Sequence, residues 1–577
     1  MAGAGPHPDG LRASAERPLR VVFFMRHQVY TRNFESTLRL LAERGHSVHV
    51  GFDRSQTDPP GAPIRAELIE RLSGEYPGRI TYGRVPWREE GLWNLESGWF
   101  RLEAEVGRAI DYLRYLDPRY RDAPKLRRRA EKKAGGGLGR LARLPLVRTP
   151  TGLRGLRRSL SWVERSLPTR AAVNRFLRER DPDIVLVTPL VDIASPQGAY
   201  LRCAKGLGVR TGLCVHSWDN LTNKGLIRDA PDFVTVWNEA QRDEAVDLHG
   251  VPREGVVVTG APGYDHWFDW SPSRDGDEFR REVGLSEGRP FLLYLCSSYF
   301  IAPREVDFVR EWLAHLRTSE SPRLREVGVL IRPHPKNVEQ WRDADLDRAG
   351  GVAVWPRTGA DPLSRQAKAD FFDSMFHCVA VVGVNTSALI ESAIVGRPAF
   401  TVLAPEFRDT QSGTLHFHHL TDEGAGLLTE ASSLDEHAGQ LDAVLSGRAD
   451  YGERLRSFVK AFVRPRGLDR AATPALVATV EQACAQPPPA PRRAGASTAV
   501  LRAAVFPAAL LLALRPVHNA YVVWVGLRHR WEHRGGRTPD LVAVPMDVEA
   551  PGENGAASGL PEPASRELGD PVARSGE

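Results

Sequence analysis

The chain has 577 residues and a mass of 63.9 kDa, with 42% hydrophobic residues, 26% charged residues and a formal net charge of +5. This length indicates several domains, and this composition excludes collagen-like, small disulfide-rich and fully disordered proteins. Residues 1–17 contain no apolar run, so they are expected to be a disordered leader and not a secretory signal. The Cys residues are widely spaced, with no Cys-x-x-Cys pair, which favours a reducing compartment.

The small net charge hides an uneven distribution. Residues 119–170 contain 16 Lys and Arg against three Asp and Glu, and residues 490–537 contain eight against one. Residues 538–577 contain two basic residues against eight acidic ones. We therefore predict an acidic body with two basic attachments and a disordered acidic tail at 538–577.

The first half of the chain alternates strands and helices. A strand at 19–25, a helix beginning at Phe34 and a strand at 47–52 form a βαβ unit, which indicates a parallel sheet. Residues 75–118 give no clear pattern, and the basic insertion 119–170 follows them. The alternation then resumes, with strands at 183–188, 210–215, 233–237 and 255–259 and helices near 195–207 and 239–249.

The second half repeats this organisation. Strands are predicted at 290–296, 327–332, 352–355, 378–382 and 399–403, with helices at 303–317, 363–377 and 386–395 and a mostly helical region at 433–485. We predict two doubly wound Rossmann-like α/β domains, 18–270 and 285–485, which face each other across a cleft. A Pro/Arg-rich linker and an apolar segment occupy 486–537.

Ligands of such domains bind at the carboxyl ends of the strands, so the loops there supply the candidate site. In the second domain, cationic side chains that suit a phosphate follow the strand 327–332. Hydroxyl and amide groups at the next strand ends suit the same phosphate, and a carboxylate one helical turn later suits a ribose diol. The predicted donor-binding residues are Arg332, His334, Lys336, Ser297, Ser298, Asn385, Thr386, Ser387 and Glu391.

The first domain supplies the candidate catalytic groups. His216 follows the strand 210–215 and is the preferred general base, with Asp219 to orient or assist it and His27 as the second candidate. The residues predicted to line the cleft or bind the acceptor are Arg26, Arg32, Asn33, Trp218, Asn220 and Lys224. The segment His416–His419 favours a cleft or lid loop over a metal site.

Two dinucleotide and nucleotide motifs are missing from the sequence. The phosphate-binding motif Gly-x-x-x-x-Gly-Lys-Ser/Thr does not occur. The motif Gly-x-Gly-x-x-Gly is also missing, which argues against a nicotinamide cofactor. We expect no required cofactor and no metal, and a nucleotide-activated donor as substrate.

The loops resemble those of two-domain GT-B glycosyltransferases, and more closely the CDP-glycerol glycerophosphotransferases and bacterial surface-polysaccharide transferases. The resemblance implies that Arg332-Pro-His334-Pro335 and Thr386-Ser387 contact the donor phosphates. It also implies a base region of the form His-Gly-x-x-x-Lys. Here His216 is followed by Ser217, and Lys224 lies eight residues on. The acidic-Tyr pair that usually precedes the Ser pair is replaced by Val384-Asn385. The resemblance covers roughly 18–485.

The basic segments suggest a membrane. Residues 503–514 and 520–527 are apolar but are separated by Arg515, Pro516, His518 and Asn519, which favours an interfacial element over a spanning helix. The Arg residues of 119–170 alternate with Leu and Val and suit anionic lipid headgroups; no nucleic-acid motif accompanies them, so no nucleic-acid partner is expected.

These features together predict a cytoplasmic enzyme that is peripheral or monotopic at the inner face of the cell membrane. It would transfer a sugar or polyol phosphate from a nucleotide-activated donor to a cell-surface glycan or lipid-linked acceptor. The alternatives are a non-hydrolysing sugar-nucleotide epimerase and a non-catalytic membrane-bound scaffold with the same fold.

Overall fold

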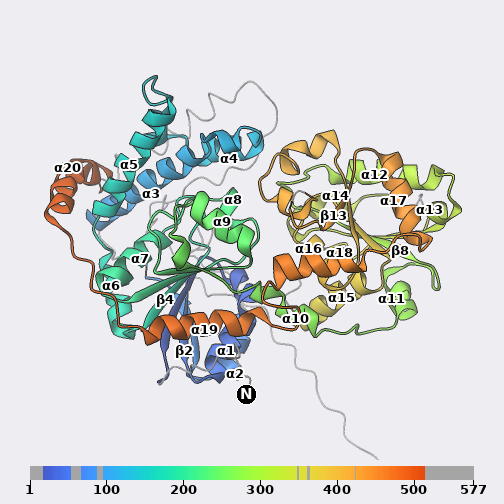
Figure 1. Cartoon of the computed structure of the whole chain (residues 1–577), viewed down its shortest axis with the longest axis horizontal. Coiled ribbons are helices and arrows are strands. Elements are labelled where there is room, and N and C mark those ends of the chain that lie inside the picture. Colours follow the sequence, from blue (N-terminus) through green and yellow to red (C-terminus); the bar gives the residue numbers. More distant parts are fainter. Residues whose placement is uncertain are drawn as a thin grey trace, which may run out of the picture. The chain divides into compact units, whose positions relative to one another are not determined.

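The structure is a computed structural model that describes residues 17–53, 67–86, 95–346, 350–359, 364–422 and 424–513. It contains two parallel sheets with helices on their faces (Figure 1). The first sheet has the order β3-β2-β1-β4-β5-β6-β7 and the second the order β10-β9-β8-β11-β12-β13. Both follow the doubly wound pattern in which the strand order reverses beside the first strand, so the predicted fold class is confirmed.

The central strands of the first sheet are buried on both faces, as parallel strands covered by helices must be, whereas the edge strands β3 and β7 are partly accessible. They are β1 (Arg20–Met25), β2 (Ser47–Phe52), β3 (Ile80–Arg84), β4 (Ile184–Thr188), β5 (Arg210–Cys214), β6 (Phe233–Val236) and β7 (Val256–Val258). The helices packed around them are α1 (Glu35–Glu43), α2 (Glu67–Glu75), α6 (Ala171–Arg180), α7 (Gln197–Gly206), α8 (Asn220–Asn223) and α9 (Glu239–Asp247).

The second sheet is built in the same way. Its strands are β8 (Phe291–Leu295), β9 (Gly328–Arg332), β10 (Val352–Val354), β11 (Ala380–Gly383), β12 (Ala399–Val402) and β13 (Leu428–Ala431). The helices of this domain are α11 (Gly276–Val283), α12 (Glu305–Thr318), α13 (Pro322–Glu326), α14 (Glu339–Arg342), α15 (Arg365–Phe376), α16 (Ala388–Ile394), α17 (Leu434–Leu445) and α18 (Gly452–Phe458).

Two segments are placed differently from the sequence-based expectation. Residues 260–288, for which no helix or strand was predicted, contain α10 (Asp265–Phe268) and α11, and Trp267 stacks on Phe372 with ring centroids 5.6 Å apart. The helix α19 (Ala472–Ala485) follows the second domain in the chain but packs on the first sheet, where Leu476, Val477 and Val480 join the core of β1 and β2. Periodicity identifies a helix but not the sheet that it covers.

The insertion belongs to the first domain. In the structure it extends back from the predicted 119–170 to residue 95, so that it contains α3 (Leu95–Arg114), α4 (Pro124–Ala134) and α5 (Pro150–Ser166). The helix α20 (Ala496–Ala513) packs against α3 and α5. Its buried carboxylates pair with buried guanidinium groups: Glu103 with Arg170 at 2.9 Å, and Arg228 with Glu164 at 2.7 Å and Asp111 at 3.0 Å. Arg228 lies outside the insertion, so its buried ion pairs fix the insertion to the rest of the first domain, because separating them would leave a buried charge uncompensated.

Candidate functional site

His216 lies directly after β5 and is held from three sides. Its Nδ1 is 3.3 Å from Thr188 Oγ1 at the end of β4, and its ring packs edge-to-face on Tyr30 at 4.4 Å. Its backbone N–H donates to Asn220 Oδ1 at 3.3 Å. Burial lowers the pKa of His216 to about 4, although the charge of Asp219 opposes this shift. The imidazole is therefore neutral at pH 7 and able to accept a proton.

Asp219 is an ionised carboxylate in the same loop. Burial by itself would raise its pKa, but Lys224, His416 and a hydrogen bond donated by Ser217 Oγ at 2.6 Å outweigh burial and lower the pKa to about 2. Asp219 acts on His216 through its charge, whereas Thr188 contacts the ring. Neither Tyr30 nor Thr188 belongs to a recognisable sequence motif, so only the structure identifies them as contacts of His216.

The insertion holds the backbone of this loop. The Arg114 guanidinium donates to the carbonyl oxygens of Gly225 at 2.7 Å and Lys224 at 3.1 Å, and also to that of Leu221. The Tyr115 and Tyr120 hydroxyls donate to the carbonyls of Lys224 at 2.7 Å and Thr222 at 2.9 Å. Buried carbonyl groups need such partners, so α3 and the turn after it determine the conformation of the loop.

In the second domain, the loops after β8 and β11 touch each other. The Asn385 N–H donates to Ser297 Oγ at 3.3 Å, and Asn385 Nδ2 donates to the Thr410 carbonyl at 2.5 Å. Asn385 and Ser297 are buried, whereas Thr386 is half-buried and Ser387 is exposed. Ser298 is also half-buried. Among the predicted donor residues of these loops, Ser298, Thr386 and Ser387 are thus the more accessible ones.

The basic residues at the end of β9 and in the loop after it differ in their burial. Arg332 is buried: it donates to Ser374 Oγ at 2.8 Å and lies over the rings of Trp355 and Phe371 at 5.2 and 5.0 Å. Burial lowers the pKa of Arg332 to about 10. His334 is half-buried and accepts the Lys336 N–H on its Nδ1 at 3.0 Å, and Lys336 is exposed.

His416 joins the two sets of loops. It lies in the second domain, between β12 and β13, and its ring nitrogens are hydrogen-bonded to the amides of Asn223 at 2.7 Å and Asn385 at 3.3 Å. Its ring also meets Trp218 edge-to-face at 4.6 Å. Close by, His419 pairs with Glu244 of α9. The structure therefore brings the His216 loop and the Asn385 loop together through His416, a residue that the sequence placed in a cleft or lid loop.

Arg26, Arg32 and Asn33 lie in the loop after β1. Arg26 pairs with Asp192 at 3.4 Å, and Arg32 acts on Glu391 of the second domain. Burial raises the pKa of Glu391 to about 7, and the charge of Arg32 opposes that shift. Glu391 is also hydrogen-bonded to Trp267. His27 caps the following 3-10 turn, because its Nδ1 accepts the Val29 N–H at 3.2 Å.

The basic insertion also reaches this site, which the sequence did not predict. Burial lowers the pKa of Lys133 on α4; Arg129 and Lys224 add to the shift and Asp192 opposes it. Arg129 donates to the carbonyl of Asn223 and lies over the Phe300 ring at 4.8 Å. Part of the Arg/Lys excess of 119–170 therefore serves the site and its supporting contacts.

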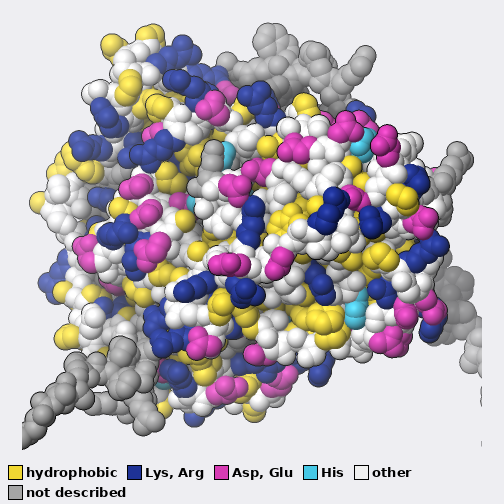
Figure 2. Space-filling view, turned by 45° about the vertical axis from the view of Figure 1, so that its right-hand side comes forward, with side chains coloured by type: hydrophobic (Ala, Val, Ile, Leu, Met, Phe, Trp, Pro, Cys, Tyr) yellow, Lys and Arg dark blue, Asp and Glu magenta, His cyan; other side chains and the backbone are white. Residues whose placement is uncertain are grey.

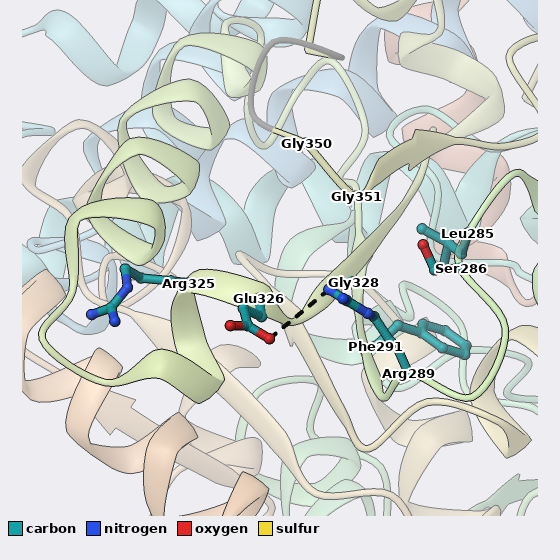
Figure 3. Close-up of a pocket in the computed structure, with 9 residues that line it drawn as sticks. All are labelled: Leu285, Ser286, Arg289, Phe291, Arg325, Glu326, Gly328, Gly350 and Gly351. Carbon is teal, nitrogen blue, oxygen red and sulfur yellow. Dashed lines mark ion pairs between the residues drawn. The ribbon is translucent and has the colours of Figure 1, made fainter.

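A separate cavity lies at the amino ends of strands of the second sheet, opposite the loops described above (Figure 3). It measures about 290 Å³, and Arg289 and Glu326 form an ion pair in it at 4.0 Å. Phe291 and Gly328, which line it, begin β8 and β9. The cavity is thus away from the loops that form the candidate site.

No protein-family model and no curated protein matches the sequence. Among solved structures, the chain is similar to the UDP-GlcNAc 2-epimerase of Methanocaldococcus jannaschii, with 9% identity and a TM-score of 0.44 over 80% of this chain and 99% of that one. A glycosyltransferase from Rickettsia africae matches with 8% identity and a TM-score of 0.45 over 82% of this chain and 100% of the other. The UDP-GlcNAc 2-epimerase of Neisseria meningitidis matches with 10% identity and a TM-score of 0.44 over 80% and 99%. We therefore infer the function from the side chains of the site.

Proposed function

We propose that this protein is a transferase that moves a sugar or polyol phosphate from a nucleotide-activated donor to a hydroxyl of a glycan or lipid-linked acceptor. One observation carries the proposal: His416 is bonded both to Asn223 and to Asn385. A neutral imidazole at His216 and the accessible hydroxyls at the start of α16 thus belong to one site. This pairs a proton acceptor with groups that bind an anionic leaving group.

The first-domain loop supplies the base. Thr188 occupies His216 Nδ1, which leaves Nε2 as the nitrogen that takes the proton from the acceptor hydroxyl. The ionised Asp219 stabilises the imidazolium that forms, because a nearby negative charge favours the protonated ring. His27 is the less suitable base, because its Nδ1 accepts the Val29 N–H and the proton of the neutral ring is then on Nε2. In His216 the Thr188 hydroxyl can accept from Nδ1–H, so Nε2 keeps its lone pair.

The second domain binds the donor. The hydroxyls of Ser298, Thr386 and Ser387 bind the diphosphate, together with His334 and Lys336. These groups stabilise the negative charge that develops as the diphosphate departs. Arg332 acts as a positioning residue, because its guanidinium is held between Ser374 and two aromatic rings under the loop. Glu391 accepts hydrogen bonds from the ribose.

The acceptor side faces the cations of the first domain. The charges of Arg26, Lys224 and Asp192 all affect the pKa of Lys133, so three cationic side chains are close together here. Such a cluster suits the phosphate of a lipid-linked acceptor. We place the enzyme on the cytoplasmic face of the membrane that carries this acceptor, in a cell that builds a surface glycan.

The test begins with the nucleotide. CMP, CDP, UDP and GDP are added to the full chain in a thermal-shift assay, and the nucleotide that stabilises wild type selects the donors for a transfer assay. The Thr386→Ala/Ser387→Ala variant should lose that stabilisation. Transfer of a group from the donor supports the proposal, and epimerisation of the free donor identifies the alternative enzyme. If no nucleotide stabilises the protein and no donor is turned over, the protein is a scaffold.

A further inference from the structure

The helix α20 (Ala496–Ala513) has an uncovered apolar side. Of its 18 residues, Ala509 and Ala513 are buried, and they pack on α3. Ser497 is exposed in its first turn. From residue 499 on, every exposed residue of the helix is apolar: Ala499, Val500, Ala503, Ala504, Phe506, Pro507, Ala508, Leu510 and Leu511. A surface helix in water normally carries polar residues on its outer side, so this side is suited to an apolar environment. In the described part of the chain, α20 is the one helix whose length and composition would allow it to cross a membrane.

The adjacent insertion continues this apolar surface. Leu144 is 50% exposed, Leu146 is 88% exposed and Trp162 on α5 is 62% exposed. Of the twelve exposed large hydrophobic residues in the described chain, eight lie in the segments 141–162 and 500–511. Two short stretches thus hold most of the exposed apolar side chains, and they belong to neighbouring elements, since α20 packs against α5.

The same surface carries an unbalanced positive charge. From Lys132 to Val163 the sequence contains eight Lys and Arg and no Asp or Glu, and Arg154, Arg157 and Arg158 are exposed on α5. Lys and Arg side chains lie among hydrophobic ones at the upper left of Figure 2, the side on which Figure 1 places the tip of α5. Apolar side chains surrounded by cations match an interface of acyl chains and anionic headgroups.

The surface is fixed to the catalytic domain. A Cβ at Gly98 of α3 would meet the Ala509 carbonyl and lie 2.9 Å from the Ala513 Cβ, so the two helices touch at this glycine. Arg101 donates to the Leu512 carbonyl at 2.7 Å, and Arg502 donates to the Ser166 carbonyl at 2.9 Å. The far end of α3 carries Arg114, which holds the His216–Gly225 loop.

We propose that the outward sides of α5, the 141–149 turn and α20 form a docking surface for a bilayer that contains anionic lipid. The helix α20 lies in the interface, with one side on α3 and α5 and the other among the acyl chains. The rigid helix α3 then sets the position of the catalytic loop relative to the membrane surface. Membrane docking does not depend on the identity of the reaction, so it can stand or fail independently of the proposed function.

Vesicle flotation of the full chain tests the proposal. Wild type should float with phosphatidylcholine vesicles that contain phosphatidylglycerol and remain largely unbound with phosphatidylcholine alone. Arg154→Gln/Arg157→Gln/Arg158→Gln should weaken binding by about tenfold or more. The matched control Arg289→Gln/Arg310→Gln/Arg323→Gln removes the same charge from exposed residues of the second domain and should bind as wild type does.

The apolar part is tested by Leu510→Ser/Leu511→Ser, which should also reduce flotation by roughly tenfold or more. Its control is Leu403→Ser/Leu468→Ser, which changes two exposed leucines elsewhere. Equal flotation of wild type and both docking variants would overturn the proposal. So would a lipid-free dimer that Leu510→Ser/Leu511→Ser converts to monomer, because a second copy would then be the partner of this surface.

Discussion

His416 and Asn223 are hydrogen-bonded at 2.7 Å, although 193 positions separate them in the sequence. The bond links a second-domain loop to the loop that carries His216. Since His416 also contacts Asn385 and Trp218, its ring fixes the neighbourhood of the candidate base and of the candidate phosphate loop together.

His216→Gln should lower the turnover number by about 10²–10⁴, the usual contribution of a general base. Nucleotide binding should be unchanged, because the donor groups lie in the second domain. The transfer assay and the nucleotide thermal shift measure the two effects. His315→Gln is the control: it removes a histidine that pairs with Asp435 on the surface of the second domain. Full transfer activity in His216→Gln would reject this residue as the base.

Arg114→Ala should impair both stability and turnover. The substitution removes the guanidinium that serves three carbonyl groups of the 221–225 loop, and each buried carbonyl left without a donor costs about 1–3 kcal/mol. Tyr120→Phe removes one donor to the same loop and should have a smaller effect. Denaturant unfolding and the transfer assay give the comparison. Wild-type turnover in both variants would show that the insertion does not position the loop.

Thr386→Ala and Ser387→Ala should each raise the donor KM, by roughly tenfold for each hydrogen bond lost to a charged phosphate. The free energy of unfolding should change little, because Thr386 is half-buried and Ser387 is exposed. Steady-state kinetics with varied donor measure the effect. Thr318→Ala, which alters an exposed hydroxyl on α12, should leave the KM unchanged. An unaltered KM in both test variants would place the donor phosphates elsewhere.

The protein should lose stability as the pH falls from about 6.5 to about 4, in part through His416. Burial lowers the pKa of His416 from 6.5 to about 4, so in this interval the unfolded chain binds a proton that the folded chain does not. The stabilisation is complete above the unfolded pKa and is lost as the pH approaches the folded pKa. A shift of this size corresponds to roughly 3 kcal/mol. Denaturant unfolding of His416→Gln should show a shallower dependence over this interval, and a slope equal to that of wild type would contradict the assignment.

Gly98→Ala should displace α20 from α3, because the added methyl group would meet the backbone of Ala509. Hydrogen exchange of 496–513 should accelerate relative to wild type. Gly155→Ala is the matched control: it lies on α5 in the same insertion, and a Cβ there meets nothing within 4 Å. If hydrogen exchange of 496–513 is equally slow in both variants, the close approach at Gly98 does not hold the helix.

The sequence predicted the sheets well because parallel strands buried on both faces are continuous apolar runs, such as Val21–Met25 and Leu292–Leu295. His216 follows one such buried strand, and Thr386 and Ser387 follow another. Since ligands bind at strand ends, the sequence already indicated these residues as candidates for the site. The leader 1–17, apart from Arg17, and the segment 514–577, which includes the acidic tail, lie outside the described residues.

The features that can be read from the amino-acid sequence are therefore local: the strands and helices, the polar loops after them, and the charge of the insertion. Which distant groups meet depends on the packing of these elements. The tertiary structure placed Arg332 among aromatic rings, directed Arg114 to the carbonyls of the 221–225 loop, packed α19 on the first sheet and joined Asn223 to Asn385 through His416. These contacts depend on how helices and loops pack in three dimensions, and periodicity along a single chain carries no information on that packing.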